Sequence, residues 1–78
     1  MAIDYSDGKY VLYGQRPEKP RVGWADNGFV YSDTGTWEFR LDGVEIYSAV
    51  GSELIGWVEA GVASTKTGKF LFIIESDA

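Results

Sequence analysis

Apolar and polar residues alternate with a period of two along several short stretches of this chain. The clearest stretch is 37–42, in which Trp37, Phe39 and Leu41 alternate with charged residues. This alternation is typical of a β-strand that buries one face. No stretch sustains the 3.6-residue period of an amphipathic helix. The pattern therefore predicts an all-β domain.

The stretch Val44–Gly61, VEIYSAVGSELIGWVEAG, reads as one β-hairpin, and three other stretches resemble it. Each unit has a short strand, a turn containing glycine, and a second strand that ends in an acidic residue. The repeat predicts about eight short antiparallel strands, arranged as four hairpins in a pseudo-fourfold flower or small barrel. The polar N-terminal tail is residues 1–9, and the single domain, residues 10–78, divides into units 10–28, 29–43, 44–61 and 62–76.

Turn residues support these boundaries. Asn27-Gly28 and Asp42-Gly43 are strong hairpin signals, because both pairs tolerate positive φ. Tyr13, Tyr31 and Tyr47 occupy equivalent positions in three units, and a serine replaces the tyrosine in the last unit. The segment 16–20, RPEKP, departs from the repeat, because prolines lack the N–H that a strand ladder needs. We expect a loop there.

The alternation also assigns the two faces of each strand. We expect the inward face to carry the apolar residues of the second strands together with one residue from most first strands. Gly23 and Gly56 would leave room beside Phe39 and Phe72, since large and small residues alternate inside small closed sheets. The predicted inward residues are Val30, Trp37, Phe39, Leu41, Ile46, Leu54, Gly56, Val58, Ala63, Phe70, Phe72 and Ile74.

The opposite face is unusually aromatic for a surface. We expect Tyr47 to lie opposite Trp57 within its hairpin, and Arg40 to reach Glu45 across the turn. Leu71 and Ile73 of the last unit also fall on this face. An apolar face of this size is a candidate interaction site. Its predicted binding residues are Tyr13, Trp24, Tyr31, Arg40, Tyr47, Ile55 and Trp57.

Four segments, VYSDTG, DGVEIYSAVG, LIGWVEAGV and KTGKFLFIIE, carry a resemblance to a known family. Across Tyr10–Glu75 the chain resembles the bacterial 4-fold beta-flower family. The resemblance implies a small all-β arrangement with pseudo-fourfold repetition. It implies no particular activity, so it transfers no functional residues to this chain. The first unit, with its prolines, departs from strict fourfold symmetry.

Composition narrows the classes of partner. The net charge is −5, and the seven basic residues are scattered, which argues against nucleic acid as a partner. The N-terminus lacks the features of a signal peptide, and the longest apolar run is Phe70–Ile74, far short of the ~20 residues of a membrane helix. We therefore expect a cytoplasmic protein with no membrane partner, and the family resemblance implies a bacterial or phage origin.

The chain contains no histidine and no cysteine, which removes the usual general base, the thiol nucleophile and the common zinc ligands. Serines and threonines lie in turn contexts and are better explained as turn-forming hydroxyls. A ring of acids, Asp26, Asp42, Glu59 and Glu75, could in principle bind a hard cation, but acids at strand ends usually serve solubility. We predict no enzyme, no catalytic residues, no cofactor and no metal.

Three functions fit this sequence. The preferred one is a non-catalytic interaction module that forms a homo-oligomer, most simply a dimer, or docks a protein partner through the outer Tyr/Trp face. The first alternative is a small-ligand binder, for a nucleotide or carbohydrate, that uses stacked aromatic rings as platforms. The second alternative is an acidic inhibitor that occupies the basic groove of a host protein.

Overall fold

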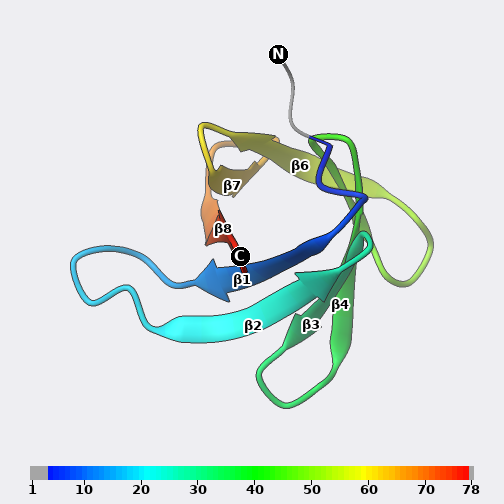
Figure 1. Cartoon of the computed structure of the whole chain (residues 1–78). Helices are drawn as coiled ribbons and strands as arrows, with labels where there is room; N and C mark the ends of the chain where they lie inside the picture. The colour runs from blue at the N-terminus through cyan, green and yellow to red at the C-terminus, as the bar shows by residue number, and fades with distance from the viewer. Residues whose placement is uncertain (1–3, 78) are drawn as a thin grey trace.

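The computed structural model describes residues 4–77, and these form a closed barrel of eight antiparallel strands in simple sequence order. Figure 1 looks into the barrel, where β1 and β8 complete the ring. The predicted all-β fold of paired hairpins is confirmed. Residues 1–3 and 78 lie outside the described part. The strands are β1 (Lys9–Tyr13), β2 (Arg21–Asp26), β3 (Phe29–Ser32), β4 (Trp37–Asp42), β5 (Glu45–Ser48), β6 (Leu54–Glu59), β7 (Val62–Thr65) and β8 (Phe70–Ser76).

The repetition is visible in the hydrogen-bond register. The pairings β1–β2, β3–β4, β5–β6 and β7–β8 each shift register at the same place, by the insertion of one extra residue in the second strand. Such β-bulges bend a strand and increase its twist, which a small closed barrel requires. The shift falls beside the equivalent positions Tyr13, Tyr31, Tyr47 and Ser64.

The two ends of the barrel differ in their connections. At one end, tight two-residue turns join β2 to β3 and β6 to β7, and Asn27, Gly28, Ala60 and Gly61 all have positive φ there, as a type I′ turn requires. The β4–β5 turn is Gly43–Val44, in which Gly43 alone has positive φ, the pattern of a type II′ turn.

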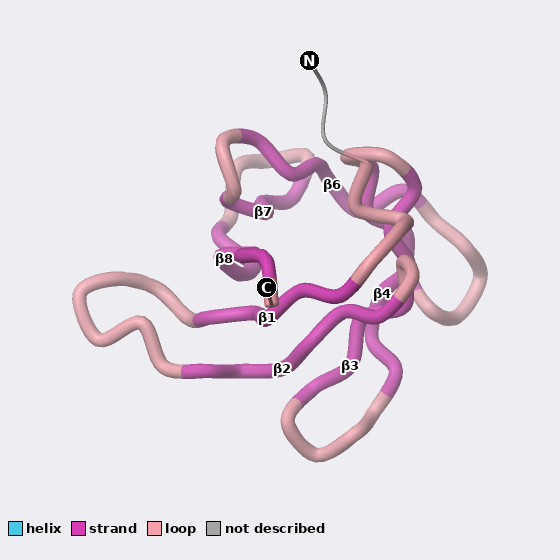
Figure 2. Tube along the Cα trace, viewed as in Figure 1, coloured by secondary structure: helices cyan, strands magenta, loops and turns pink. Residues whose placement is uncertain are grey.

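At the other end, longer loops close the four bulged hairpins. Figures 1 and 2 show three of them, β1–β2, β3–β4 and β5–β6, projecting away from the ring in different directions. In the last three hairpins a hydroxyl of the strand end, from Ser32, Ser48 or Thr65, accepts a hydrogen bond from a backbone N–H across the loop, at 3.0–3.2 Å. These hydroxyls therefore form turns, as the sequence predicts.

The interior is filled as the large-small alternation predicts. The rings of Phe39 on β4 and Phe72 on β8 come from opposite sides of the barrel and meet at a centroid distance of 6.2 Å. The glycines Gly23 and Gly56 lie on β2 and β6, between the strands that carry the two rings. The surrounding core contains Leu12, Ala25, Val30, Leu41, Ile46, Val58, Ala63 and Ile74.

The bulges overturn the predicted inward positions of three residues at the start of the second strands. The register pairs Trp37 with Tyr31, Leu54 with Tyr47 and Phe70 with Ser64, on the outer side of the barrel. Trp37 is 43% exposed. The prediction extended a strict period of two through each strand, and the extra residue breaks that period.

Two residues predicted to point outward are placed differently for the same reason. Ile55 and Leu71 are the inserted residues of their bulges, and both are half-buried against the core. A third, Ile73, keeps its predicted outward register, paired with Val62 and with Tyr13. It is nevertheless buried, at 7% exposure.

The segment before β1 closes the end of the barrel that carries the tight turns. The Tyr5 side chain is 5% exposed and belongs to the core, where it meets Tyr10 edge to face at 5.1 Å. The Tyr5 N–H donates to the Gly43 carbonyl at 3.0 Å, and Asn27 and Gly8 exchange two further hydrogen bonds. Tyr5 thus takes part in the core although it precedes the first strand.

Candidate functional site

The predicted binding residues lie on the outer surface, with one exception, but they do not form a single face. Trp24 is on β2 and Trp57 is on β6, half the ring apart in the closed barrel. One flat interface cannot cover both indoles. Ile55 is the exception, because it packs against the core. The remaining residues divide into a cluster on β2–β5, Trp57 on β6, and Tyr13 on β1.

The largest aromatic cluster spans β2, β3 and β4, and we call it the outer aromatic patch. It consists of Trp24, Phe29, Tyr31 and Trp37. Trp24 and Tyr31 stack with their ring centroids 5.6 Å apart and their planes at 25°. Phe29 and Trp37 meet edge to face at 5.7 Å. Both geometries are favourable for aromatic pairs, so the rings hold one another in place.

Phe29 and Trp37 are the most exposed members of the patch, at 41% and 43%. Sequence reasoning missed both of them as site residues. The alternation that places Tyr31 outside also places Phe29 outside, so this signal was present in the sequence. Trp37 carried no comparable signal, because its outward direction depends on the bulge between β3 and β4. The indole N–H of Trp37 donates to the Phe39 carbonyl at 3.0 Å, which fixes the ring.

Next to the patch, Arg40 and Tyr47 form a small polar group. The Arg40 guanidinium carbon lies 5.4 Å from the centre of the Tyr47 ring, within cation–π range. The Tyr47 hydroxyl donates to Glu45 Oε1 at 3.0 Å, and this bond raises the pKa of Tyr47 because it favours the protonated phenol. The sequence predicted a contact between Arg40 and Glu45. In the structure the Glu45 carboxylate instead accepts the hydrogen bond from Tyr47, and Arg40 lies against the Tyr47 ring.

The neighbours of Trp57 also differ from the expectation. The shifted register pairs Tyr47 with Leu54, and it pairs Trp57 with Glu45 and Ser64. Trp57 is 41% exposed and has no aromatic ring among these strand neighbours. It is therefore a single exposed indole, separate from the outer aromatic patch.

Tyr13 is engaged by its own hairpin loop. The Lys19 ammonium lies 4.7 Å from the centre of the Tyr13 ring, and the same ammonium forms an ion pair with Glu75. The RPEKP loop thus folds back over the outer end of β1, where the Gly14 N–H donates to the Pro20 carbonyl at 2.6 Å. Tyr13 contributes to the packing of this loop rather than to the patch.

The acidic residues Asp26, Asp42, Glu59 and Glu75 lie at or near the ends of β2, β4, β6 and β8. Within residues 4–77, no three Asp or Glu side chains come together as a group that could hold a metal ion. The same part of the chain contains no helix that is long and apolar enough to cross a membrane.

Comparison with protein-family models, with curated proteins and with solved structures finds no match to this chain. The candidate site is thus defined by its own geometry: four ordered rings on three adjacent strands, with Arg40 and Tyr47 at one side.

Proposed function

We propose that this protein is a non-catalytic interaction module that forms a homodimer through the outer aromatic patch. The observation that carries the proposal is the pair Phe29–Trp37, two large rings that are about 40% exposed and already fixed against each other. Rings that are ordered before binding lose little side-chain entropy when they are buried. Completing the burial of each ring is worth roughly 2 kcal/mol.

A second copy of the chain is the partner that the surrounding charges favour. Arg40 and Asp42 alternate along the outer side of β4, next to Phe29 and Trp37. In a twofold interface the same patch meets itself, so Arg40 of one copy can face Asp42 of the other. β4 of each copy then supplies both the positive and the negative group for ion pairs between the two copies. The small size of the chain is a further reason, since self-association covers apolar surface that a domain this small leaves exposed.

We also infer a relationship to the 4-fold beta-flower family. The support is the equivalent register shift in all four hairpins, which is what a fourfold repeat of one hairpin unit would produce. The resemblance implies no activity, so the proposed function rests on the patch alone.

Sedimentation equilibrium over a range of protein concentrations tests the dimer. We expect the wild-type protein to approach twice the 8.6-kDa chain mass, and Trp37→Ala and Phe29→Ser to remain monomeric. Two variants are needed because the Trp37 indole also donates to the Phe39 carbonyl, whereas Phe29 can be changed without removing that bond. Circular dichroism verifies that both variants stay folded.

Trp57→Ala is the matched control, because Trp57 has nearly the same exposure, 41%, but lies outside the patch. It should dimerise like the wild type. A wild-type protein that stays monomeric at high concentration contradicts self-association, and docking of a different protein would then be the remaining use of the patch. Equal loss of the dimer in Trp57→Ala would contradict the assignment to this face.

A further inference from the structure

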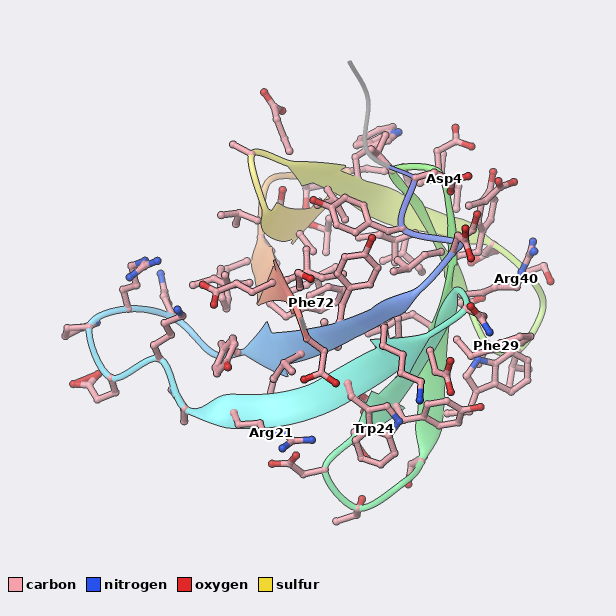
Figure 3. The ribbon with its side chains drawn as sticks, viewed as in Figure 1. Asp4, Arg21, Trp24, Phe29, Arg40 and Phe72 are labelled. Atoms are coloured by element: carbon pink, nitrogen blue, oxygen red, sulfur yellow. The ribbon has the colours of Figure 1, made fainter. Side chains whose placement is uncertain are left out.

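A shallow hollow lies on the outer surface of β1 and β2, beside Trp24. Its volume is about 350 Å³, at the small end of the ~300–1,000 Å³ typical of ligand pockets. Figure 3 shows Arg21 and Trp24 on the outer side of β2, while Phe72 lies inside the barrel. Its lining combines the Trp24 ring and Val11 with four charged residues, and it also includes Tyr10 and Ala25, which pack with the core. The lining residues that matter are Lys9, Val11, Arg21, Trp24, Asp26 and Asp77.

Trp24 supplies a flat apolar platform. Its two strand neighbours are Tyr31 on β3 and Val11 on β1. Tyr31 stacks on one face of the indole at 5.6 Å, and Trp24 also lines the hollow beside β1, so the opposite face of the indole is the one assigned to a ligand. The stacked tyrosine fixes the orientation of this face before any ligand arrives. A preformed platform of this kind suits a ring-shaped ligand.

The charged groups around the platform balance. Lys9 and Arg21 are positive, Asp26 and Asp77 are negative, and Lys9 is opposite Asp26 in the register of β1 and β2. The Arg21 Nε lies 3.7 Å from Asp33 Oδ1, with both side chains more than half exposed, so this ion pair is loose and leaves the guanidinium free to turn. The hollow therefore offers both hydrogen-bond donors and carboxylate acceptors, without a net charge.

This balance selects the class of ligand. A phosphate-bearing ligand would meet two carboxylates in the hollow and a chain of net charge −5. A quaternary ammonium would meet Lys9 and Arg21. A neutral ring with several hydroxyl groups uses both kinds of lining group, because each hydroxyl can donate to a carboxylate and accept from an ammonium or a guanidinium. The apolar C–H face of such a ring packs on the indole.

We propose that this hollow is a carbohydrate-binding site that takes a pyranose ring, alone or at the end of a short oligosaccharide, stacked on the free face of Trp24. Arg21 and Asp26 bind the hydroxyl groups at the ring edge. The site shares Trp24 with the outer aromatic patch, but its charged groups and Val11 lie on β1 and β2, apart from the Phe29–Trp37 pair that carries the proposed dimer. Substitution of Phe29 or Trp37 therefore tests the dimer, and substitution of Arg21 or Asp26 tests the sugar site.

The second half of the barrel provides an internal comparison. Trp57 occupies on β6 the position that Trp24 occupies on β2, at the end of an equivalent Gly-Trp pair. Its surroundings differ: Ser64 stands in place of Tyr31, Glu45 in place of Val11 and Leu54 in place of Arg21. Trp57 thus lacks the stacked ring and the basic partner. The proposal therefore requires that no sugar bind at Trp57.

The test is a titration of the ¹⁵N-labelled protein followed by two-dimensional NMR. The probes are glucose, galactose, mannose and N-acetylglucosamine, together with cellobiose, maltose and lactose. We expect at least one sugar to shift the indole signal of Trp24 and the amides of Val11 and Asp26, with a Kd on the order of 1 mM or tighter. The indole signal of Trp57 should not move.

Variants assign the binding to this hollow. Trp24→Ala should weaken binding at least tenfold, and Trp57→Ala should leave it unchanged. Asp26→Asn and Arg21→Gln, which keep the platform, should each weaken binding about threefold to tenfold, consistent with the typical net contribution of one hydrogen bond. These two variants keep the test decisive if Trp24→Ala fails to fold.

Several results would overturn the proposal. One is the absence of shifts with every sugar, and another is an equal response of the two indoles. Titrations with AMP and with choline run in parallel, and binding of either at the same residues in place of a sugar would also reject the carbohydrate assignment. Trp37→Ala, whatever its mass in solution, should bind the sugar like the wild type.

Discussion

Tyr5 illustrates at the scale of one residue how the open end of a small barrel is closed. Its ring belongs to the core although it precedes the first strand, and its backbone N–H is bonded to Gly43 in the β4–β5 turn. Burial raises the pKa of Tyr5, with a further contribution from the neighbouring Tyr10, because the phenolate would lose its hydration in this position.

The raised pKa predicts a loss of stability at alkaline pH. Below about pH 10, the ordinary pKa of tyrosine, Tyr5 is protonated in both the folded and the unfolded chain. Above it the unfolded chain releases the proton first, so the free energy of unfolding falls as pH rises toward the pKa of the folded state. We expect urea denaturation from pH 8 to about pH 11 to show this decline in the wild type.

The control for this effect is Tyr5→Phe, which keeps the ring and removes the ionisable hydroxyl. The informative quantity is the difference in unfolding free energy between the two proteins, because every ionisable group except the Tyr5 hydroxyl is common to both. Above about pH 10, the free energy of unfolding should fall more steeply for the wild type than for Tyr5→Phe. A difference that is constant with pH would show that the Tyr5 hydroxyl does not matter to alkaline stability.

At the scale of one element, the second strand of each hairpin has a bulge, and the residue directly after the bulge faces the interior, where the space allows only a particular size of side chain. In β2 and β6 that position is a glycine. A Cβ on Gly56 would lie 1.9 Å from the Ser64 carbonyl oxygen, and one on Gly23 would lie 2.0 Å from the Tyr31 carbonyl oxygen. The equivalent position is Phe39 in β4 and Phe72 in β8. The glycines thus permit close backbone approach, in addition to leaving room for the two rings.

Gly56→Ala should therefore be strongly destabilising, by about 3 kcal/mol or more, because the added methyl group meets backbone that cannot rotate away. Chemical denaturation measures the loss. The control is Gly35→Ala: Gly35 has a φ of 88° but nothing within 4 Å of the new methyl group. It should cost only about 1 kcal/mol, from the left-handed conformation alone. Equal costs would mean that steric contact at Gly56 is unimportant.

At the scale of the whole molecule, ring closure joins the first strand to the last. β8 pairs with β7 and also with β1, and it contributes Phe72 and Ile74 to the core. Closure leaves none of the eight strands in residues 4–77 with an unpaired edge, which protects a β protein from edge-to-edge aggregation. The pairings of β8 are therefore needed by both halves of the barrel.

A chain that ends at Gly68 lacks β8 and tests this dependence. We expect it to lose cooperative thermal unfolding completely and to aggregate, because the edges of β1 and β7 are exposed and the core is open. A chain that ends at Ser76 keeps all of β8 and should unfold cooperatively. A folded, monomeric product of the shorter chain would show that closure is dispensable.

The candidate site was predictable from sequence only in part. Tyr31 and Trp24 followed from alternation, which is a local property of each strand. Trp37 did not, because the bulge that turns it outward depends on the bending of β4 against β3. Ile55 was misplaced for the same reason. The repeat gives Trp24 and Trp57 equivalent positions, and the sequence therefore predicted that both belong to one binding face. Ring closure instead places them on opposite sides of the barrel.

The amino-acid sequence by itself determined the all-β class, the hairpin pairing and most of the core, since these depend on alternation and on turn residues such as Asn27-Gly28. Tertiary structure alone decided the register at each bulge, the burial of Tyr5 and the grouping of the outer rings. The physical reason is the same in each case. These features arise from closing a twisted sheet into a ring, which brings together residues that no local pattern relates.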